Sequence, residues 1–156
     1  MIMVFFHTTN HTTNLTTQGT DMTNPSNHPA SSQTKDPVYD KGMATRTAVL
    51  GADYVQGAAK RATDFTRPLQ DMVTRHAWGN TWQRTGIDLK TRSIVTVSML
   101  VALGRMHELK IHVRGALNNG VTPAELQEIF LHASVYCGFP AAMDAFRTAS
   151  EVVDAP

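Results

Sequence analysis

Apolar residues recur at helical spacing along most of the chain, but the first part lacks this pattern. From Tyr39 onward, apolar positions three and four apart predict successive helices. Residues 1–37 are instead rich in Thr, Asn, Ser, His and Pro, and such a segment buries too little apolar surface to offset its loss of conformational entropy. We therefore expect a disordered tail over 1–37, or an over-extended start with Met22 as the true initiator, and a folded domain over 38–156.

Capping residues and glycines divide the periodic part into helices. A first helix from about Tyr39 is expected to end at Gly51, and the next to begin at a capping Asp53 and run to about Val73. Later helices are expected to begin after Asp88, after the break at Gly104, at the Thr122-Pro123-Ala124-Glu125 capping box and, after Gly138, at Ala141. No segment has the pattern of a strand, so the chain is predicted to be all-α with six or seven helices.

One predicted helix carries polar groups among apolar neighbours. Glu108 precedes His112 by four residues, which puts both side chains on one helix face. The apolar neighbours, which predict that this helix is largely buried, are Met99, Leu100, Leu103, Leu109, Ile111 and Val113. A buried carboxylate and imidazole are costly unless they pair, and burial with close pairing shifts pKa values toward neutrality. We interpret Glu108 and His112 as a candidate acid–base pair, with a structural histidine as the alternative.

Composition limits the classes of function. The chain has 156 residues and a net charge of +1 without a basic block, so no nucleic-acid partner is expected. The longest apolar run, 94–103, is too short and polar to span a membrane. Cys137 is the single cysteine, which excludes an internal disulfide or dithiol cycle and makes the cytoplasm the expected compartment. No metal site is predicted, because the tail histidines are scattered (His7, His11 and His28).

Five ordered motifs carry a family resemblance. They are Thr-Arg-His-Ala-Trp-Gly at 74–79, Thr-Arg-Ser at 91–93, Glu-Leu-Lys-Ile-His-Val-Arg at 108–114, Asn-Asn-Gly-Val-Thr at 118–122 and Tyr-Cys-Gly-Phe-Pro-Ala-Ala at 136–142. With them the chain resembles the 4-carboxymuconolactone decarboxylases, in the superfamily shared with alkyl hydroperoxidase D-like proteins. The resemblance implies a compact helical domain and a homo-oligomer, a hexamer. It also implies cofactor-independent conversion of 4-carboxymuconolactone to 3-oxoadipate enol-lactone and CO2, in protocatechuate breakdown by the β-ketoadipate pathway.

The implied reaction suggests roles for particular residues. The substrate's own lactone accepts the electrons, so neither a cofactor nor a metal is expected. The protein must hold a lactone that carries two carboxylates, stabilise an oxyanion and deliver a proton to carbon. A guanidinium forks onto a carboxylate, which suits arginine for the binding task. The candidates are Glu108 and His112 as the acid–base pair, either of which could protonate carbon, Arg75, Arg92 and His76 as carboxylate ligands, and Trp78 with Trp82 as pocket walls.

Structural roles are the alternatives for several of these residues. Arg75 could pair with a helix C-terminus. Arg92 could form a salt bridge with Asp88, four residues before it. The two tryptophans could instead be core or interface residues.

A thiol redox protein of the same superfamily is the rival function. Its peroxidase members carry Cys-x-x-Cys-x-x-x-His on the corresponding helix. Counted back from Gly120, His112 matches their histidine, whereas Glu108 and Arg105 stand where they have cysteines. Redox chemistry would therefore depend on Cys137 acting between molecules. A non-catalytic relative is a third possibility.

Overall fold

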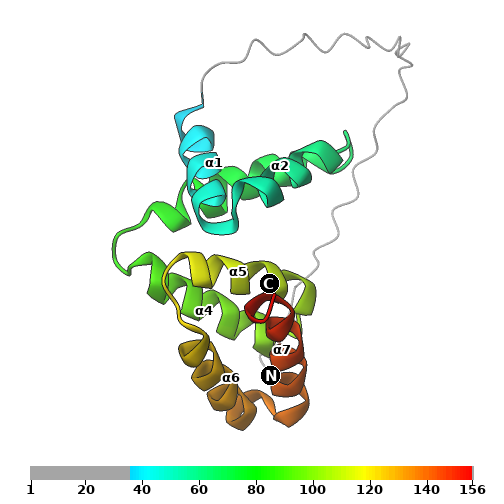
Figure 1. The fold of residues 1–156 in the computed structure, drawn as a ribbon. Coiled ribbons are helices and arrows are strands. Elements are labelled where there is room, and N and C mark those ends of the chain that lie inside the picture. The colour runs from blue at the N-terminus through cyan, green and yellow to red at the C-terminus, as the bar shows by residue number, and fades with distance from the viewer. Residues whose placement is uncertain (1–35, 156) are drawn as a thin grey trace, which may run out of the picture. The chain divides into compact units, whose positions relative to one another are not determined.

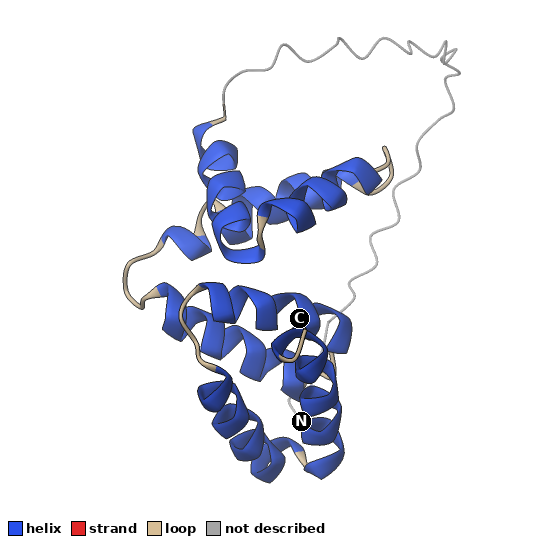
Figure 2. Cartoon of the chain, in the orientation of Figure 1, coloured by secondary structure: helices blue, strands red, loops and turns tan. Residues whose placement is uncertain are grey.

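The computed structural model describes residues 36–155, and within them every regular element is helical (Figures 1 and 2). The predicted all-α class is therefore confirmed. The expected tail lies outside the described residues, apart from its last two positions. The elements are α1 (Pro37–Leu50), α2 (Ala52–Arg61), α3 (Arg67–Val73), the π-helix η1 (Thr74–Trp78), the 3-10 turn η2 (Thr81–Gln83), α4 (Leu89–Ala102), α5 (Met106–Asn118), α6 (Pro123–Cys137) and α7 (Phe139–Val153).

Local capping sets where several helices begin. Asp36 accepts hydrogen bonds from the backbone N–H groups of Val38 and Tyr39, both at 3.1 Å, so α1 begins one residue before the expected domain boundary. The predicted capping box of α6 is present, with Thr122 and Glu125 bonding each other's backbone N–H groups. Lys90 on α4 adds an ion pair to the same carboxylate at 2.7 Å, and these bonds lower the pKa of Glu125 to about 2.

The expected single helix from Asp53 to Val73 is wrong, because the chain forms α2 and α3 with a turn between them. Thr63 and Thr66 bond each other's backbone N–H groups through their side chains, which favours a turn over a continuous helix. Pro68, in the first turn of α3, also lacks the backbone N–H that a continuous helix would need at this position. Asp53 is not the cap either, since Gly51 occupies that position with a φ of 90°.

The last helix begins earlier than expected. α7 starts at Phe139 rather than at Ala141, and it includes Pro140 in its first turn. Proline is tolerated there because the N–H groups of the first turn have no partner within the helix.

Two buried apolar clusters meet at α5. The first lies among α4, α5, α6 and α7 and includes Leu109 and Val113, both fully buried. The second joins α1, α2, η1 and η2, with Ile111 of α5 packed against it; its buried members are Val49, Leu50, Val55, Trp78 and Trp82. Helical periodicity directs Leu109 and Val113 to one face of α5 and Ile111 to another. His112 lies against the second cluster, because its ring stacks on Trp78 and Trp82.

α1 and η1 approach each other closely at two glycines. A Cβ atom on Gly42 would overlap the carbonyl oxygen of Thr74, and one on Gly79 would overlap the carbonyl oxygen of Val38. Both glycines are buried. The contact fixes η1, and with it Trp78, against α1.

No helix within residues 36–155 combines the length and apolar character needed to cross a bilayer.

Candidate active site

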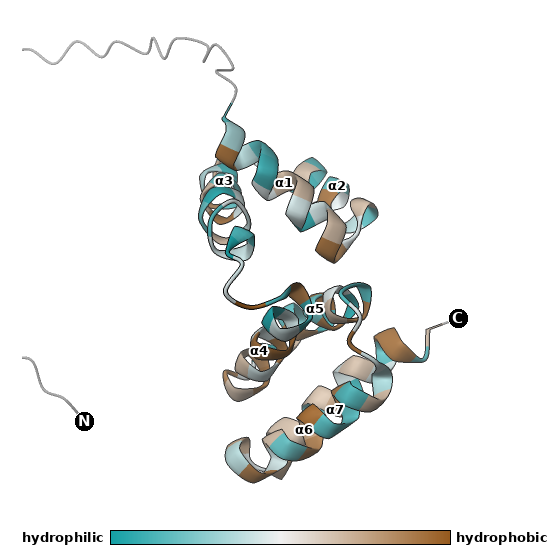
Figure 3. Ribbon diagram, turned by 90° about the vertical axis from the view of Figure 1, so that its left-hand side faces the viewer, coloured by the Kyte–Doolittle hydropathy of each residue, from teal (hydrophilic) through white to brown (hydrophobic). Residues whose placement is uncertain are grey.

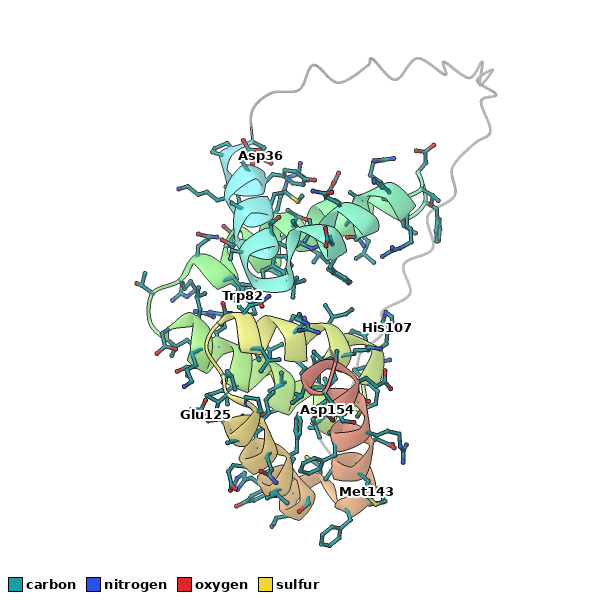
Figure 4. All side chains as sticks on the ribbon, in the orientation of Figure 1. Asp36, Trp82, His107, Glu125, Met143 and Asp154 are labelled. Atoms are coloured by element: carbon teal, nitrogen blue, oxygen red, sulfur yellow. The ribbon has the colours of Figure 1, made fainter. Side chains whose placement is uncertain are left out.

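His112 lies against two buried indole rings. Its half-buried imidazole stacks on Trp78, with ring centroids 6.2 Å apart and 5° between the planes, and on Trp82, at 6.5 Å and 26°. The two indoles contact each other at 4.6 Å and are only 4% and 9% exposed. Both tryptophans therefore belong to the second buried cluster. The same rings also form a wall beside His112 (Trp82 is labelled in Figure 4).

The irregular backbone of η1 positions this wall. The Gly79 N–H donates to the carbonyl oxygen of Thr74 at 2.8 Å, a five-residue spacing that adds one residue to the helical turn. The side chain of Gln83 then donates to the Trp78 carbonyl oxygen at 2.9 Å and to the Thr45 hydroxyl at 2.6 Å. These bonds tie the segment between the two tryptophans to α1. Sequence reasoning missed Gln83, since nothing in its neighbourhood indicates a partner 38 residues away.

Glu108 acts on His112 through charge rather than through contact. Burial lowers the pKa of His112 below its usual 6.5, and the Glu108 carboxylate partly opposes that shift. No hydrogen bond between the two side chains is found within residues 36–155. Glu108 is exposed, so its expected burial is wrong: it lies in the first turn of α5, beyond the packed face of that helix. There it also interacts favourably with the helix N-terminus, which is a structural role available to any acidic residue.

We expect the imidazole of His112 to titrate below pH 6.5, because the walled site disfavours its charged form. Replacing Glu108 by glutamine removes the neighbouring negative charge and is expected to lower this pKa further. An NMR titration of the histidine ring signals, assigned with His112→Ala, measures both values. A higher pKa in Glu108→Gln would contradict the electrostatic coupling.

Arg75 and His76 are on η1, as Trp78 is, but they line a pocket that does not include His112. Arg75 donates to the Asp36 carboxylate at 2.6 Å and lies over the ring of Tyr39 at 5.3 Å, both at the beginning of α1. The hydrogen bond from Arg75 is the main reason that the pKa of Asp36 falls below its ordinary value. Arg75 thus has a structural partner, which is a capping carboxylate rather than the helix C-terminus of the alternative interpretation. With His76 it lines an open pocket of about 480 Å³ beside α3.

Arg92 lies close to the segment that follows Trp82. Its guanidinium donates to the carbonyl oxygen of Arg84 at 2.9 Å, and its buried Nε atom has no hydrogen-bond partner among the residues that the structure describes. The alternative salt bridge to Asp88 is absent from residues 36–155, where Asp88 instead caps α4 by accepting from the Thr91 N–H. Arg92 therefore keeps donor capacity that no described residue satisfies.

Cys137 lies at the end of α6 and is half-buried. It lines a pocket of about 490 Å³ together with His132 and Tyr136, and this pocket does not include His112. The thiol and the imidazole thus belong to separate surroundings.

Residues 67–151 match the carboxymuconolactone decarboxylase family, over more than half of the chain. The chain belongs to this family. The matched stretch contains every candidate site residue, whereas α1 and α2 lie outside it.

The relatives include three decarboxylases. A nitrosuccinic acid decarboxylase of Metarhizium robertsii is 45% identical over 121 residues, which cover 75% of this chain and 85% of the relative. A 4-carboxymuconolactone decarboxylase of Acinetobacter baylyi is 45% identical over 114 residues, which cover 73% and 85%. Another of that name, from Pseudomonas putida, is 45% identical over 42 residues, which cover 27% and 88%.

The candidate site residues form separate groups within the stretch that matches the family. Arg75, Trp78, Arg92, Glu108 and His112 come from three elements of the matched stretch, η1, α4 and α5. The structure brings Trp78, Trp82 and His112 into contact. Arg75 and His76 form a second group, and Arg92 lies at the beginning of α4.

Proposed function

We propose that this protein is a carboxy-lyase that converts 4-carboxymuconolactone to 3-oxoadipate enol-lactone and CO2. The observation that carries the proposal is the 45% identity to the Acinetobacter baylyi decarboxylase over 85% of that relative. The half-buried His112, walled by two indoles and one turn from a carboxylate, supplies a chemical group suited to such a reaction.

The reaction can proceed without a cofactor. The departing carboxylate is on the ring carbon that is bonded to the ring oxygen. As this carbon–carbon bond breaks, its electron pair moves through the ring double bond to the lactone carbonyl, which releases CO2 and leaves a dienolate. One proton added to the ring carbon beside that carbonyl completes the enol-lactone. The protein must therefore supply binding, oxyanion stabilisation and one proton.

We assign the proton transfer to His112, with Glu108 as the group that adjusts it. Burial makes the imidazolium a stronger acid, which favours transfer of its proton to the dienolate carbon. The negative charge of Glu108 favours reprotonation of the neutral His112 imidazole after each turnover. Glu108 is exposed, so it is in contact with the solvent that supplies this proton. The indoles of Trp78 and Trp82 exclude water from one side of the ring.

For the carboxylates of the substrate, Arg92 is the better placed arginine. It is half-buried next to the segment that follows Trp82, and its Nε has no hydrogen-bond partner among residues 36–155. Arg75 is already held by Asp36, so carboxylate binding by Arg75 and His76 would use the pocket beside α3.

Nitrosuccinate is a second candidate substrate, because the Metarhizium robertsii relative is equally identical over a similar length. This acid also carries two carboxylates, and one of them is on the carbon that bears the nitro group. Loss of CO2 there leaves a nitronate, which likewise needs a proton at carbon. The two reactions therefore place the same demands on the site.

Parallel assays of the purified chain separate these functions. Loss of 4-carboxymuconolactone and loss of nitrosuccinate are followed spectroscopically, together with CO2 release and peroxide consumption in the presence of a thiol reductant. We expect turnover of 4-carboxymuconolactone with release of CO2 and without consumption of peroxide. Turnover of nitrosuccinate alone would identify nitrosuccinate as the substrate. Peroxide consumption alone would favour the thiol redox function, and no turnover of any compound would favour a non-catalytic role.

Cys137→Ser is expected to keep most decarboxylase activity, because the thiol lines a pocket that does not include His112. The check is kcat/KM of the variant beside the parent, with circular dichroism and light scattering to establish the same fold and assembly. A correctly assembled variant without turnover would revive a thiol mechanism.

We also propose that the chain assembles into a homohexamer. Large apolar side chains are exposed on or next to α3, α4, α6 and α7, and such a surface favours contact with other copies of the chain (hydrophobic residues are brown in Figure 3). They include Phe65, Leu69, Met72, Met99, Leu103, Val135, Tyr136, Phe139 and Met143. A cytoplasmic location is also proposed, from the single cysteine.

Light scattering at micromolar concentration is expected to give six times the chain mass of 17.1 kDa. Burial of these apolar faces is the reason for the expected assembly. A monomer at that concentration would contradict it.

A further inference from the structure

Arg46, in the middle of α1, is a buried cation whose partners are neutral. Its side chain belongs to a residue only 8% exposed. Its guanidinium donates to the Thr74 hydroxyl at 3.3 Å and to the Gln70 side-chain oxygen at 3.0 Å, while its buried Nε has no partner in the described part of the chain. Within residues 36–155 it forms no ion pair.

Such an arrangement is costly in free energy. A buried charge is stabilised by an opposite charge and by a full set of hydrogen bonds, and removing the opposite charge strongly destabilises a fold. Arginine is the residue type best suited to bind small oxyanions and other anions in these surroundings, because its planar donors are rigid and always charged. Arg46 therefore has unused capacity to bind an anion.

A small cavity adjoins this side chain. It has a volume of about 70 Å³ and lies between α1, α2 and α3, with Tyr39, Gln70, Asp71 and Thr74 among its polar lining residues. This exceeds the roughly 15 Å³ that one water molecule needs by this kind of measure. It suits an anion the size of chloride or of a single carboxylate group, and it is too small for the dicarboxylate substrates discussed above.

The charges around the cavity favour an anion. The charged side chains that line it are Arg46, Arg67 and Asp71, so one positive charge is in excess. Asp71 forms no ion pair with Arg46 within the described residues, and Arg67 is paired with Asp64 at 4.0 Å on the exposed side.

From these contacts we infer that the cavity beside Arg46 is a binding site for a small monovalent anion, a halide or a small carboxylate-like oxyanion. The bound anion neutralises Arg46 and links α1 to α3 and to Thr74, the first residue of η1. This site is separate from the decarboxylation chemistry, and its expected effect is on the stability of the α1–η1 packing.

The test is the thermal midpoint of the full chain at fixed ionic strength. Sodium gluconate, whose anion is too large for the cavity, is replaced stepwise by up to 100 mM sodium chloride, formate or bicarbonate. We expect a saturable rise of about 4 °C with at least one small anion, because a ligand that binds only the folded state stabilises it. The separate salts distinguish a halide site from an oxyanion site. An equal midpoint in all four salts would overturn the proposal and leave water in the cavity.

Four variants connect the response to Arg46. Gln70→Glu supplies a carboxylate beside the guanidinium, so it is expected to melt higher in gluconate and to lose the anion response. Arg46→Gln is expected to lose the response, whereas the control Arg147→Gln, on α7 and paired with Asp144, is expected to keep it. A full response in Gln70→Glu would overturn the proposal even if Arg46→Gln does not fold. A response seen only in Asp71→Asn would overturn it too, because Asp71 would then be the counterion of Arg46.

Discussion

Replacing His112 by alanine is expected to lower kcat for 4-carboxymuconolactone by about 10²–10⁴-fold, the usual contribution of a positioned acid. The dienolate would then depend on water for its proton, on a side of the site that Trp78 and Trp82 cover. Glu108→Gln is expected to lower kcat less than His112→Ala does. The expected decrease is about tenfold for each unit by which the pKa of His112 falls. Steady-state kinetics over pH 5–9 measure both effects.

The matched control is His107→Ala, which removes an exposed imidazole from the same helix and is expected to retain turnover. Circular dichroism and light scattering establish that each variant folds and assembles. If Glu108→Gln lost as much activity as His112→Ala, Glu108 would be the acid itself. Turnover close to the parent in both variants, with substrate binding intact, would place the site on another helix.

Gly42→Ala is expected to destabilise the fold by about 3 kcal/mol, at the upper end for overpacking, because the added methyl group overlaps backbone that cannot rotate away. The thermal midpoint should fall by about 10 °C. Because Thr74 begins η1, its displacement should also move Trp78 away from His112 and lower kcat. Differential scanning calorimetry and kinetics at 20 °C measure the two consequences.

Gly57→Ala is the matched control, since this glycine also lies within a helix but its new Cβ would meet only the flexible end of Arg61. It is expected to be neutral or slightly stabilising, because alanine favours a helix over glycine. If Gly42→Ala melted at the parent temperature, the close approach of α1 and η1 would not exist in solution.

The amino-acid sequence by itself determined the local features. The capping box at Thr122 and the cap at Asp88 depend on neighbours three residues away, so the helices that follow them could be predicted. The four-residue spacing of Glu108 and His112 likewise determined that they lie one turn apart on α5. The break between α2 and α3 was local as well, in Thr63, Thr66 and Pro68, and was missed because the apolar spacing continues across it.

Only the tertiary structure decided which side chains meet. Asp36 lies 39 residues before Arg75, and Trp78 lies 34 residues before His112, so neither contact follows from helical periodicity. The π-helical turn of η1 packs closely against Gly42 on another helix, and Trp78 is its last residue. A periodic pattern specifies the buried face of each helix. Which helix covers that face, and therefore how strongly His112 is desolvated, depends on the packing of the whole domain.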